Sequence, residues 1–166
     1  MRTIIGVMGS GRPLDGTALR VAHDLGARIA AEGWVLLTGG RAAGVMDAVS
    51  QGAREAGGLV VGVLPDEDTS SASSHLDIAI RTGMGDARNV VNVLSSDVVI
   101  ALPGGAGTVS EVALALNAER PVILLGWDAG AVLRASAEGS LFDASDIDEA
   151  IRLVKRALSG KMKREP

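Results

Sequence analysis

Short apolar runs alternate with amphipathic stretches along most of this chain. One short strand is predicted over residues 76–81, where apolar and polar positions alternate more. The sequence therefore predicts an α/β fold, a Rossmann-like doubly wound parallel sheet in a single domain. The other five predicted strands consist almost entirely of apolar residues, as strands buried on both faces of a parallel sheet do: 3–8, 34–38, 59–64, 98–102 and 121–125.

Helices are predicted between the strands. Asp86 is expected to cap a helix that turns Val90, Val91 and Leu94 inward, and Ser145 to cap the last helix. Helical spacing of apolar residues predicts the others: a first helix that ends at Gly33, a second over 45–56, and one that ends near Ala118.

Three segments lie outside this regular pattern. Residues 65–74 are polar, acidic and rich in serine, so we expect a mobile loop. Residues 126–139 predict neither helix nor strand clearly. We expect one nucleotide- or phosphate-binding domain over residues 1–160, followed by a solvated basic tail over 161–166.

A glycine-rich turn directly follows the predicted strand 98–102. Its glycines lack the Cβ atoms that would hold a ligand away from the backbone, and the next helix would aim free N–H groups at the same space. Such a corner suits a phosphate, and Glu111 would lie about one turn into the helix. A structural alternative is a capping box between Thr108 and Glu111, although it leaves the glycines unexplained. The turn consists of Pro103, Gly104, Gly105, Ala106, Gly107 and Thr108.

Two further glycine-rich loops follow predicted strands, and a third candidate segment precedes the strand 98–102. The carboxyl ends of parallel strands share one rim, so these segments are expected to meet the first turn there. An arginine fork binds phosphate or carboxylate through two hydrogen bonds. The candidate ligand-binding residues are Gly9, Ser10, Gly11, Arg12, Gly39, Gly40, Arg41, Gly44 and Met84, with Arg88 beside them.

The segment PGGAGTVSE, residues 103–111, resembles the PGGxGTxxE motif of the LONELY GUY (LOG) family, whose characterised members are cytokinin-nucleotide phosphoribohydrolases. Residues 82–89 are similar to a smaller branch of that superfamily, which includes molybdenum cofactor carrier proteins. The resemblance extends from Thr3 to about Trp127.

The resemblance implies that Arg88 and Glu111 are catalytic in an N-glycosidic hydrolysis that releases a base and ribose 5-phosphate. A carboxylate beside the ribose can stabilise the positive charge of the transition state. Asn89 stands where the LOG family has a lysine, and Asp47 where it has a glycine. These departures suit the alternative, a non-catalytic carrier of molybdenum cofactor or of a related phosphorylated pterin or nucleotide.

The resemblance also implies a homo-oligomer, a dimer or a tetramer, and the apolar helix face over 90–94 is a candidate interface. Trp127 is expected to pack or to contact a subunit rather than to cover a ligand. No enzyme cofactor is expected, because the molybdenum cofactor would be cargo.

Composition excludes several other classes. A net charge of −4 without a basic cluster before the tail, and 2% aromatic residues, disfavour nucleic-acid binding. No cysteine is present and His23 and His75 are far apart, so no metal site is expected. No apolar run is long enough to cross a membrane, and we expect a cytoplasmic protein.

Relatives in the superfamily are sometimes labelled lysine decarboxylases. A pyridoxal phosphate enzyme needs a lysine for its Schiff base, and the lysines of this chain lie at its C-terminal end. They are Lys155, Lys161 and Lys163. The sequence also lacks the P-loop signature and the G-x-S-x-G nucleophile motif.

Overall fold

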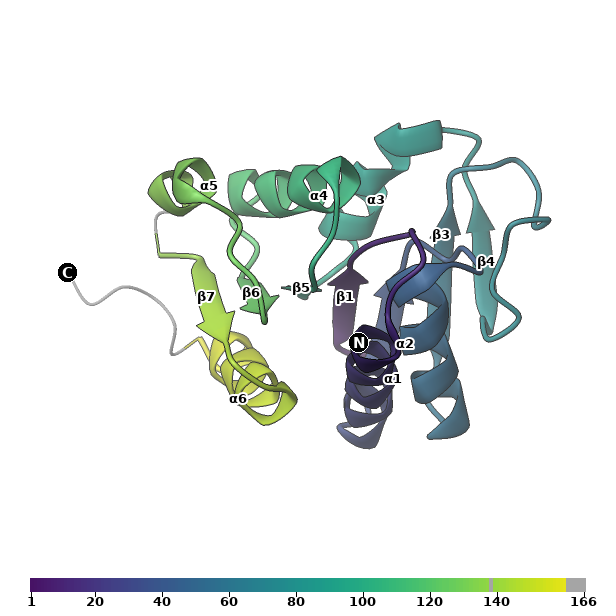
Figure 1. The fold of residues 1–166 in the computed structure, drawn as a ribbon, viewed down its shortest axis with the longest axis horizontal. Coiled ribbons are helices and arrows are strands. Elements are labelled where there is room, and N and C mark those ends of the chain that lie inside the picture. The colour runs from purple at the N-terminus through teal and green to yellow at the C-terminus, as the bar shows by residue number, and fades with distance from the viewer. Residues whose placement is uncertain (138, 161–166) are drawn as a thin grey trace.

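Seven parallel strands form one sheet in the order β4-β3-β2-β1-β5-β6-β7 (Figure 1). The structure is a computed structural model that describes residues 1–137 and 139–160. The predicted Rossmann-like doubly wound fold is confirmed. The strands are β1 (Ile4–Met8), β2 (Val35–Thr38), β3 (Val60–Leu64), β4 (Ile78–Arg81), β5 (Val98–Ala101), β6 (Val122–Leu125) and β7 (Leu141–Ala144).

Helices cover both faces of the sheet (Figure 1). Helices α1, α2 and α6 pack on one face over an apolar cluster that includes Ile5, Leu25 and Ile100. Helices α3, α4 and α5 pack on the other face, over a cluster that includes Val99 and Leu124. The helical elements are α1 (Gly16–Ala31), α2 (Gly44–Glu55), the 3₁₀ turn η1 (Gly85–Arg88), α3 (Asn89–Leu94), α4 (Ala106–Asn117), α5 (Ala131–Ser136) and α6 (Ile147–Leu158).

The strand order reverses between β1 and β5, which pair with each other at the centre of the sheet. From β1 the chain proceeds through α1 to β2, and from β5 it proceeds through α4 to β6 on the opposite side. The loops that leave β1 and β5 therefore diverge at the carboxyl edge. In doubly wound sheets this is the position where ligands bind.

Helices α1 and α2 approach each other closely because two glycines face the neighbouring backbone. A Cβ added at Gly26 would overlap the carbonyl oxygen of Val49, and one at Gly52 would overlap the carbonyl oxygen of His23. The two helices thus pack backbone against backbone, which anchors the loops that precede them at the carboxyl edge.

Two predicted details are wrong. In α3, Val91 packs inward as predicted, but Val90 and Leu94 are exposed. Asn89, Asn92 and Val93 are buried instead. Asp86 does not cap this helix with its side chain, because η1 continues directly into it.

The cap of α6 also differs from the prediction. Asp146, not Ser145, is the N-cap, and its carboxylate accepts from the N–H of Glu149. Ser145 lies one residue earlier and donates its own N–H to the Glu149 carboxylate.

The two segments of uncertain prediction are ordered by hydrogen bonds or regular structure. The stretch 126–139 contains α5, and β7 follows it. The polar loop is bonded to the β2–α2 loop, where Ala42 donates to Ser71 and Ser73 donates to Gly40. These hydrogen bonds hold the polar loop to its neighbour, in contrast to the mobile loop that we expected. The predicted tail over 161–166 lies outside the described residues.

Trp127 packs, as predicted, against the apolar cluster beneath α4. Its indole Nε1 donates to the carbonyl of Ala101 at 2.8 Å. Within the described part of the chain, no helix is long and apolar enough to cross a membrane.

Replacing Gly52 with alanine is expected to lower the free energy of unfolding by about 2 kcal/mol or more, because the added methyl group overlaps the α1 backbone. Gly16→Ala is the matched control. Its added Cβ has Arg20 as its nearest neighbour at 4.0 Å, so a change within about 0.5 kcal/mol is expected. Urea unfolding of both variants measures the difference, and equal stabilities would contradict the packing described here.

Candidate functional site

The glycine-rich turn after β5 lies at the point where the strand order reverses. Helix α4 begins at Ala106, and its N-cap residue Gly105 has no side chain to donate or accept. The backbone N–H groups of residues 104–108 donate to no protein acceptor within the described residues. They form an unshared cluster of donors at the positive end of a twelve-residue helix.

The capping-box alternative is wrong for this turn. Thr108 lies inside α4, and its buried side chain packs against Gly104, where an added Cβ would overlap it. The Glu111 carboxylate accepts a hydrogen bond from Asn92 instead of returning to the turn. The side chains that could have satisfied the free N–H groups therefore have other partners.

The glycines of the turn have two different roles. Gly104 makes room for Thr108. At Gly105 and Gly107, by contrast, an added Cβ would meet no protein atom within 4 Å. These two positions border open space, so packing does not require a glycine there.

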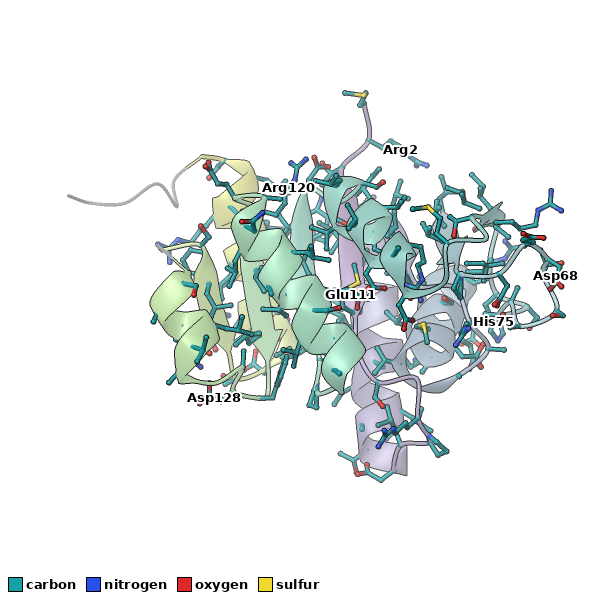
Figure 2. The ribbon with its side chains drawn as sticks, turned by 90° about the horizontal axis from the view of Figure 1, so that it is seen from above. Arg2, Asp68, His75, Glu111, Arg120 and Asp128 are labelled. Carbon is teal, nitrogen blue, oxygen red and sulfur yellow. The ribbon has the colours of Figure 1, made fainter. Side chains whose placement is uncertain are left out.

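Glu111 is a buried carboxylate with two partners on one oxygen. The side-chain amide of Asn92 donates to Oε1 at 2.8 Å, and Nη1 of Arg88 lies 3.6 Å from the same atom. Glu111 is 6% exposed, and its Oε2 has no hydrogen-bond partner among the described residues. Figure 2, which views the molecule from the side of α3, α4 and α5, places Glu111 near the middle of that face.

Burial raises the pKa of the Glu111 carboxyl, whereas the hydrogen bond from Asn92 and the charge of Arg88 act in the opposite direction. Burial also lowers the pKa of the Arg88 guanidinium, against the opposing effect of Glu111. Arginine nevertheless keeps its charge at any physiological pH. A buried cation and a buried carboxyl group with a raised pKa thus lie side by side next to the turn.

Arg88 occupies space that the second glycine-rich loop leaves open. A Cβ added at Gly39 would lie 2.7 Å from Nη2 of Arg88 and 2.7 Å from Sδ of Met46. The guanidinium therefore extends from η1 to the end of β2 while it contacts Glu111 on α4. Its Nε is buried and has no hydrogen-bond partner among the described residues.

Backbone hydrogen bonds connect three of the predicted segments. The N–H of Ser10 donates to the carbonyl of Pro103 at 3.2 Å, and the N–H of Val45 donates to the carbonyl of Ser10 at 2.9 Å. A Cβ at Gly44 would overlap that Ser10 carbonyl, and one at Gly9 would lie 2.7 Å from the Val45 side chain. Gly9 and Gly44 therefore allow the loops after β1 and β2 to approach the turn after β5.

The remaining predicted residues lie farther out on the rim. Gly11 approaches the side chain of Met46, and Gly40 packs against Gly62 with a φ of 76°. The exposed residues of this group are Gly11, Arg12, Arg41 and Met84, whereas Gly40 is buried. Arg41 lies 3.6 Å from Asp66, and its charge also acts on the pKa of Arg88.

Two asparagines of α3 belong to the site and were missed by the sequence reasoning. Asn92 holds Glu111, and Asn89 donates to Ser110 Oγ at 3.1 Å, which donates in turn to the carbonyl of Gly107 at 2.7 Å. The sequence did carry a signal for them: Asn89 and Asn92 are three residues apart, and positions i and i+3 share a helix face.

Asp47, which departs from the LOG motif, also has a partner. Its carboxylate accepts from the hydroxyl of Ser73 at 2.6 Å and so connects α2 to the polar loop. In Figure 2, Asp68 of that loop lies at the edge of the molecule, away from Glu111.

Two larger hollows lie away from Arg88 and Glu111. One of about 950 Å³ is lined by residues that include Asn117, Pro121 and Ser140, at the amino ends of β6 and β7. The other, of about 640 Å³, lies between α1 and α6 and is lined by residues that include Leu102, Leu125 and Pro103, the first residue of the turn. The candidate site is instead an open corner, as suits a charged headgroup held by backbone N–H groups.

The doubly wound sheet, with a glycine-rich corner where the strand order reverses, defines a Rossmann-like protein. The chain belongs to the SLOG cluster4 family, whose sequence pattern matches residues 2–151. The resemblance to the LOG superfamily, and to its molybdenum cofactor carrier branch, is confirmed.

Solved structures with the same fold include a protein that binds molybdenum cofactor and one that carries it. The molybdenum cofactor binding protein of Rippkaea orientalis is 50% identical, with a TM-score of 0.91 over 95% of this chain and 98% of that one. The molybdenum cofactor carrier protein of Chlamydomonas reinhardtii is 46% identical, with a TM-score of 0.89 over 96% of this chain and 99% of that one.

A more distant relative is an enzyme. The cytokinin riboside 5'-monophosphate phosphoribohydrolase of Mycobacterium tuberculosis is 36% identical over 110 residues, which are 65% of this chain and 59% of the enzyme. The matched region thus spans less than two thirds of the length of that enzyme.

Glu111→Gln is expected to remove a pH dependence of stability. The pKa of Glu111 is raised in the folded state above its usual value of 4.5, so the stability that its proton contributes is complete below that value and is lost as the pH rises through the folded-state pKa. The wild type should therefore lose stability relative to the variant over this window, by up to ~1.4 kcal/mol per pH unit.

Urea unfolding across a pH series measures this difference. Glu119→Gln, a change of an exposed acid beyond the other end of α4, is the control. Parallel stability curves for the wild type and Glu111→Gln would contradict the raised pKa.

Proposed function

We propose that this protein binds and carries molybdenum cofactor, a pterin that bears a phosphate, and does not transform it. The observation that carries the proposal is the set of free N–H groups at residues 104–108, which border open space at Gly105 and Gly107. A phosphate is the ligand that such a helix N-terminus binds best. The similarity to molybdenum cofactor binding and carrier proteins over nearly the whole chain supports the same cargo.

In this proposal the phosphate accepts hydrogen bonds from the N–H groups of residues 105–108. Arg88 supplies a buried positive charge nearby, and Arg41 adds a second one at the rim. The loop after β1, which donates to Pro103 through Ser10, fixes the shape of the turn. The pterin would extend along the rim formed by the other glycine-rich loops, and we propose Gly39–Gly44, Gly9–Arg12 and Met84 as its surroundings.

A second candidate function is hydrolysis of a nucleoside 5'-monophosphate. One observation favours it: Oε2 of Glu111 has no hydrogen-bond partner among the described residues, so this oxygen is free to act on a ribose beside the bound phosphate. Arg88 and Glu111 would be its catalytic residues, as in the LOG resemblance. The carrier is preferred because Oε1 is already held by Asn92 and Arg88 and because Asn89 replaces the lysine of the hydrolase motif.

Adding methyl groups at both Gly105 and Gly107 is expected to weaken binding of molybdenum cofactor at least tenfold without unfolding the protein. The added atoms have no neighbour within 4 Å among the described residues but enter the space proposed for the phosphate. Alanine is favoured over glycine within a helix by up to ~1 kcal/mol, which applies to Gly107 and offsets the smaller preference for glycine at the N-cap position Gly105. Titration calorimetry and the ratio of molybdenum to protein after gel filtration measure the loss, with Gly16→Ala as the control.

The same proteins distinguish the two functions. The wild type, incubated with cytokinin riboside 5'-monophosphate and purine monophosphates, should release no more free base than Glu111→Gln. Release of base that depends on Glu111 would replace the carrier by the hydrolase, and unchanged cofactor binding by the double variant would contradict the proposed corner.

We also propose a homo-oligomer in which a second copy covers the apolar surface beside α3. Val90 and Leu94 are 41% and 54% exposed. Ile80 pairs in register with Val63 of the α3-side cluster, so Ile78 and Ile80 face the same side of the sheet and are also exposed. A parallel sheet is normally covered on both faces, which supports coverage by another subunit here. A cytoplasmic location stays a prediction.

Leu94→Glu is expected to shift the protein toward monomer in sedimentation velocity, because it places a charge within the proposed apolar contact. Val132→Glu is the matched control, since Val132 is an exposed valine on α5 at 79% exposure, away from this surface. A wild type that sediments as a monomer, or an equal response of the two variants, would contradict the proposed interface.

A further inference from the structure

Helix α3 buries two asparagines together with Val93, whereas Val90 and Leu94 face solvent. The buried asparagines are Asn89 and Asn92, at 7% and 0% exposure. Burying a polar side chain is favourable only when it is hydrogen-bonded. The orientation of α3 is therefore explained by what its two asparagines bind on α4.

Asn92 is fully buried, and its amide donates to Oε1 of Glu111 at 2.8 Å. Its Oδ1 is also buried and has no partner among the described residues. Within the described part of the chain, the side chain of Asn92 therefore makes its hydrogen bond to Glu111 alone. Ser96 fixes the backbone of Asn92 by donating its hydroxyl to the Asn92 carbonyl at 2.7 Å.

Among the described residues, one charged side chain, that of Arg88, affects the pKa of Glu111. Arg88 acts on it from η1. Arg88 is itself influenced by Arg41 of the β2–α2 loop, by Asp86 of η1 and by Asp66 of the polar loop. The side chain that α3 contributes to Glu111 is the uncharged amide of Asn92.

We propose that Asn92 is a positioning residue that keeps Glu111 a carboxylate paired with Arg88, and so sets the pH range over which the α4 corner accepts an anion. This inference rests on the proposed function only in taking the α4 corner to be an anion site. Asn92 would then control the pH dependence of binding at that site.

A hydrogen bond donated to a carboxylate favours its charged form, so loss of the Asn92 N–H raises the pKa of Glu111 further. Protonation of Glu111 removes a negative charge beside the corner and leaves Arg88 without a competing partner. An anion should consequently bind more tightly as the pH falls through the pKa of Glu111.

The test uses the full chain and follows the carboxyl carbon of Glu111 by ¹³C NMR across a pH series. In Asn92→Leu the titration midpoint is expected to move upward by about 1 pH unit or more, the effect of losing a hydrogen bond to a charged group. Ser96→Ala is the control, because it disturbs the same end of α3 without touching Glu111. Asn92→Ala replaces the leucine variant if the amide spectrum of the latter shows that it does not fold.

Sulfate, which does not titrate over this range, is the anion probe. Its affinity should increase toward low pH in the wild type, do so at higher pH in Asn92→Leu, and vary little with pH in Glu111→Gln. A folded Asn92 variant in which the Glu111 midpoint does not move overturns the inference. A midpoint that moves while sulfate affinity stays independent of pH overturns its second half.

Failure of the proposed function has a different signature. If the Glu111 midpoint moves but no variant binds sulfate, Asn92 controls the carboxyl group as inferred and the α4 corner is not an anion site.

Discussion

The first turn of α4 leaves its backbone N–H groups without partners among the described residues, and the architecture of the site depends on that fact. A helix end normally satisfies such groups with a side-chain cap. Here Gly105 has no side chain, Thr108 packs against Gly104, and Glu111 is held by Asn92 and Arg88. The turn therefore keeps its donors directed at open space, at the point where the strand order reverses.

The glycines of the site divide by what surrounds them. Gly9, Gly39 and Gly44 permit close approach, because side chains or backbone of Val45, Arg88 and Ser10 occupy the space that a Cβ would need. Gly105 and Gly107 have no such neighbour. The first group assembles the loops and positions Arg88, and the second leaves room beside the N–H groups. Both roles are needed before the corner can bind anything.

The fold and the corner could be predicted because their signals are local. A strand buried on both faces is apolar throughout, and the glycine-rich turn follows β5 directly in the sequence. The orientation of α3 could not be predicted in the same way. In six residues its valines and asparagines fit a helical face equally well, and only contact with Ser110 and Glu111 decides between them. The capping of α6 by Asp146 rather than its neighbour Ser145 is a similar choice between adjacent candidates.

The most direct measurement of the central claim is a crystal structure of the protein with molybdenum cofactor or sulfate bound. The account predicts an anionic group within hydrogen-bond distance of the N–H groups of residues 105–108, with the Glu111 carboxyl still held by Asn92. Density for the bound phosphate or sulfate at another place on the molecule, with the first turn of α4 contacting only solvent, would contradict it.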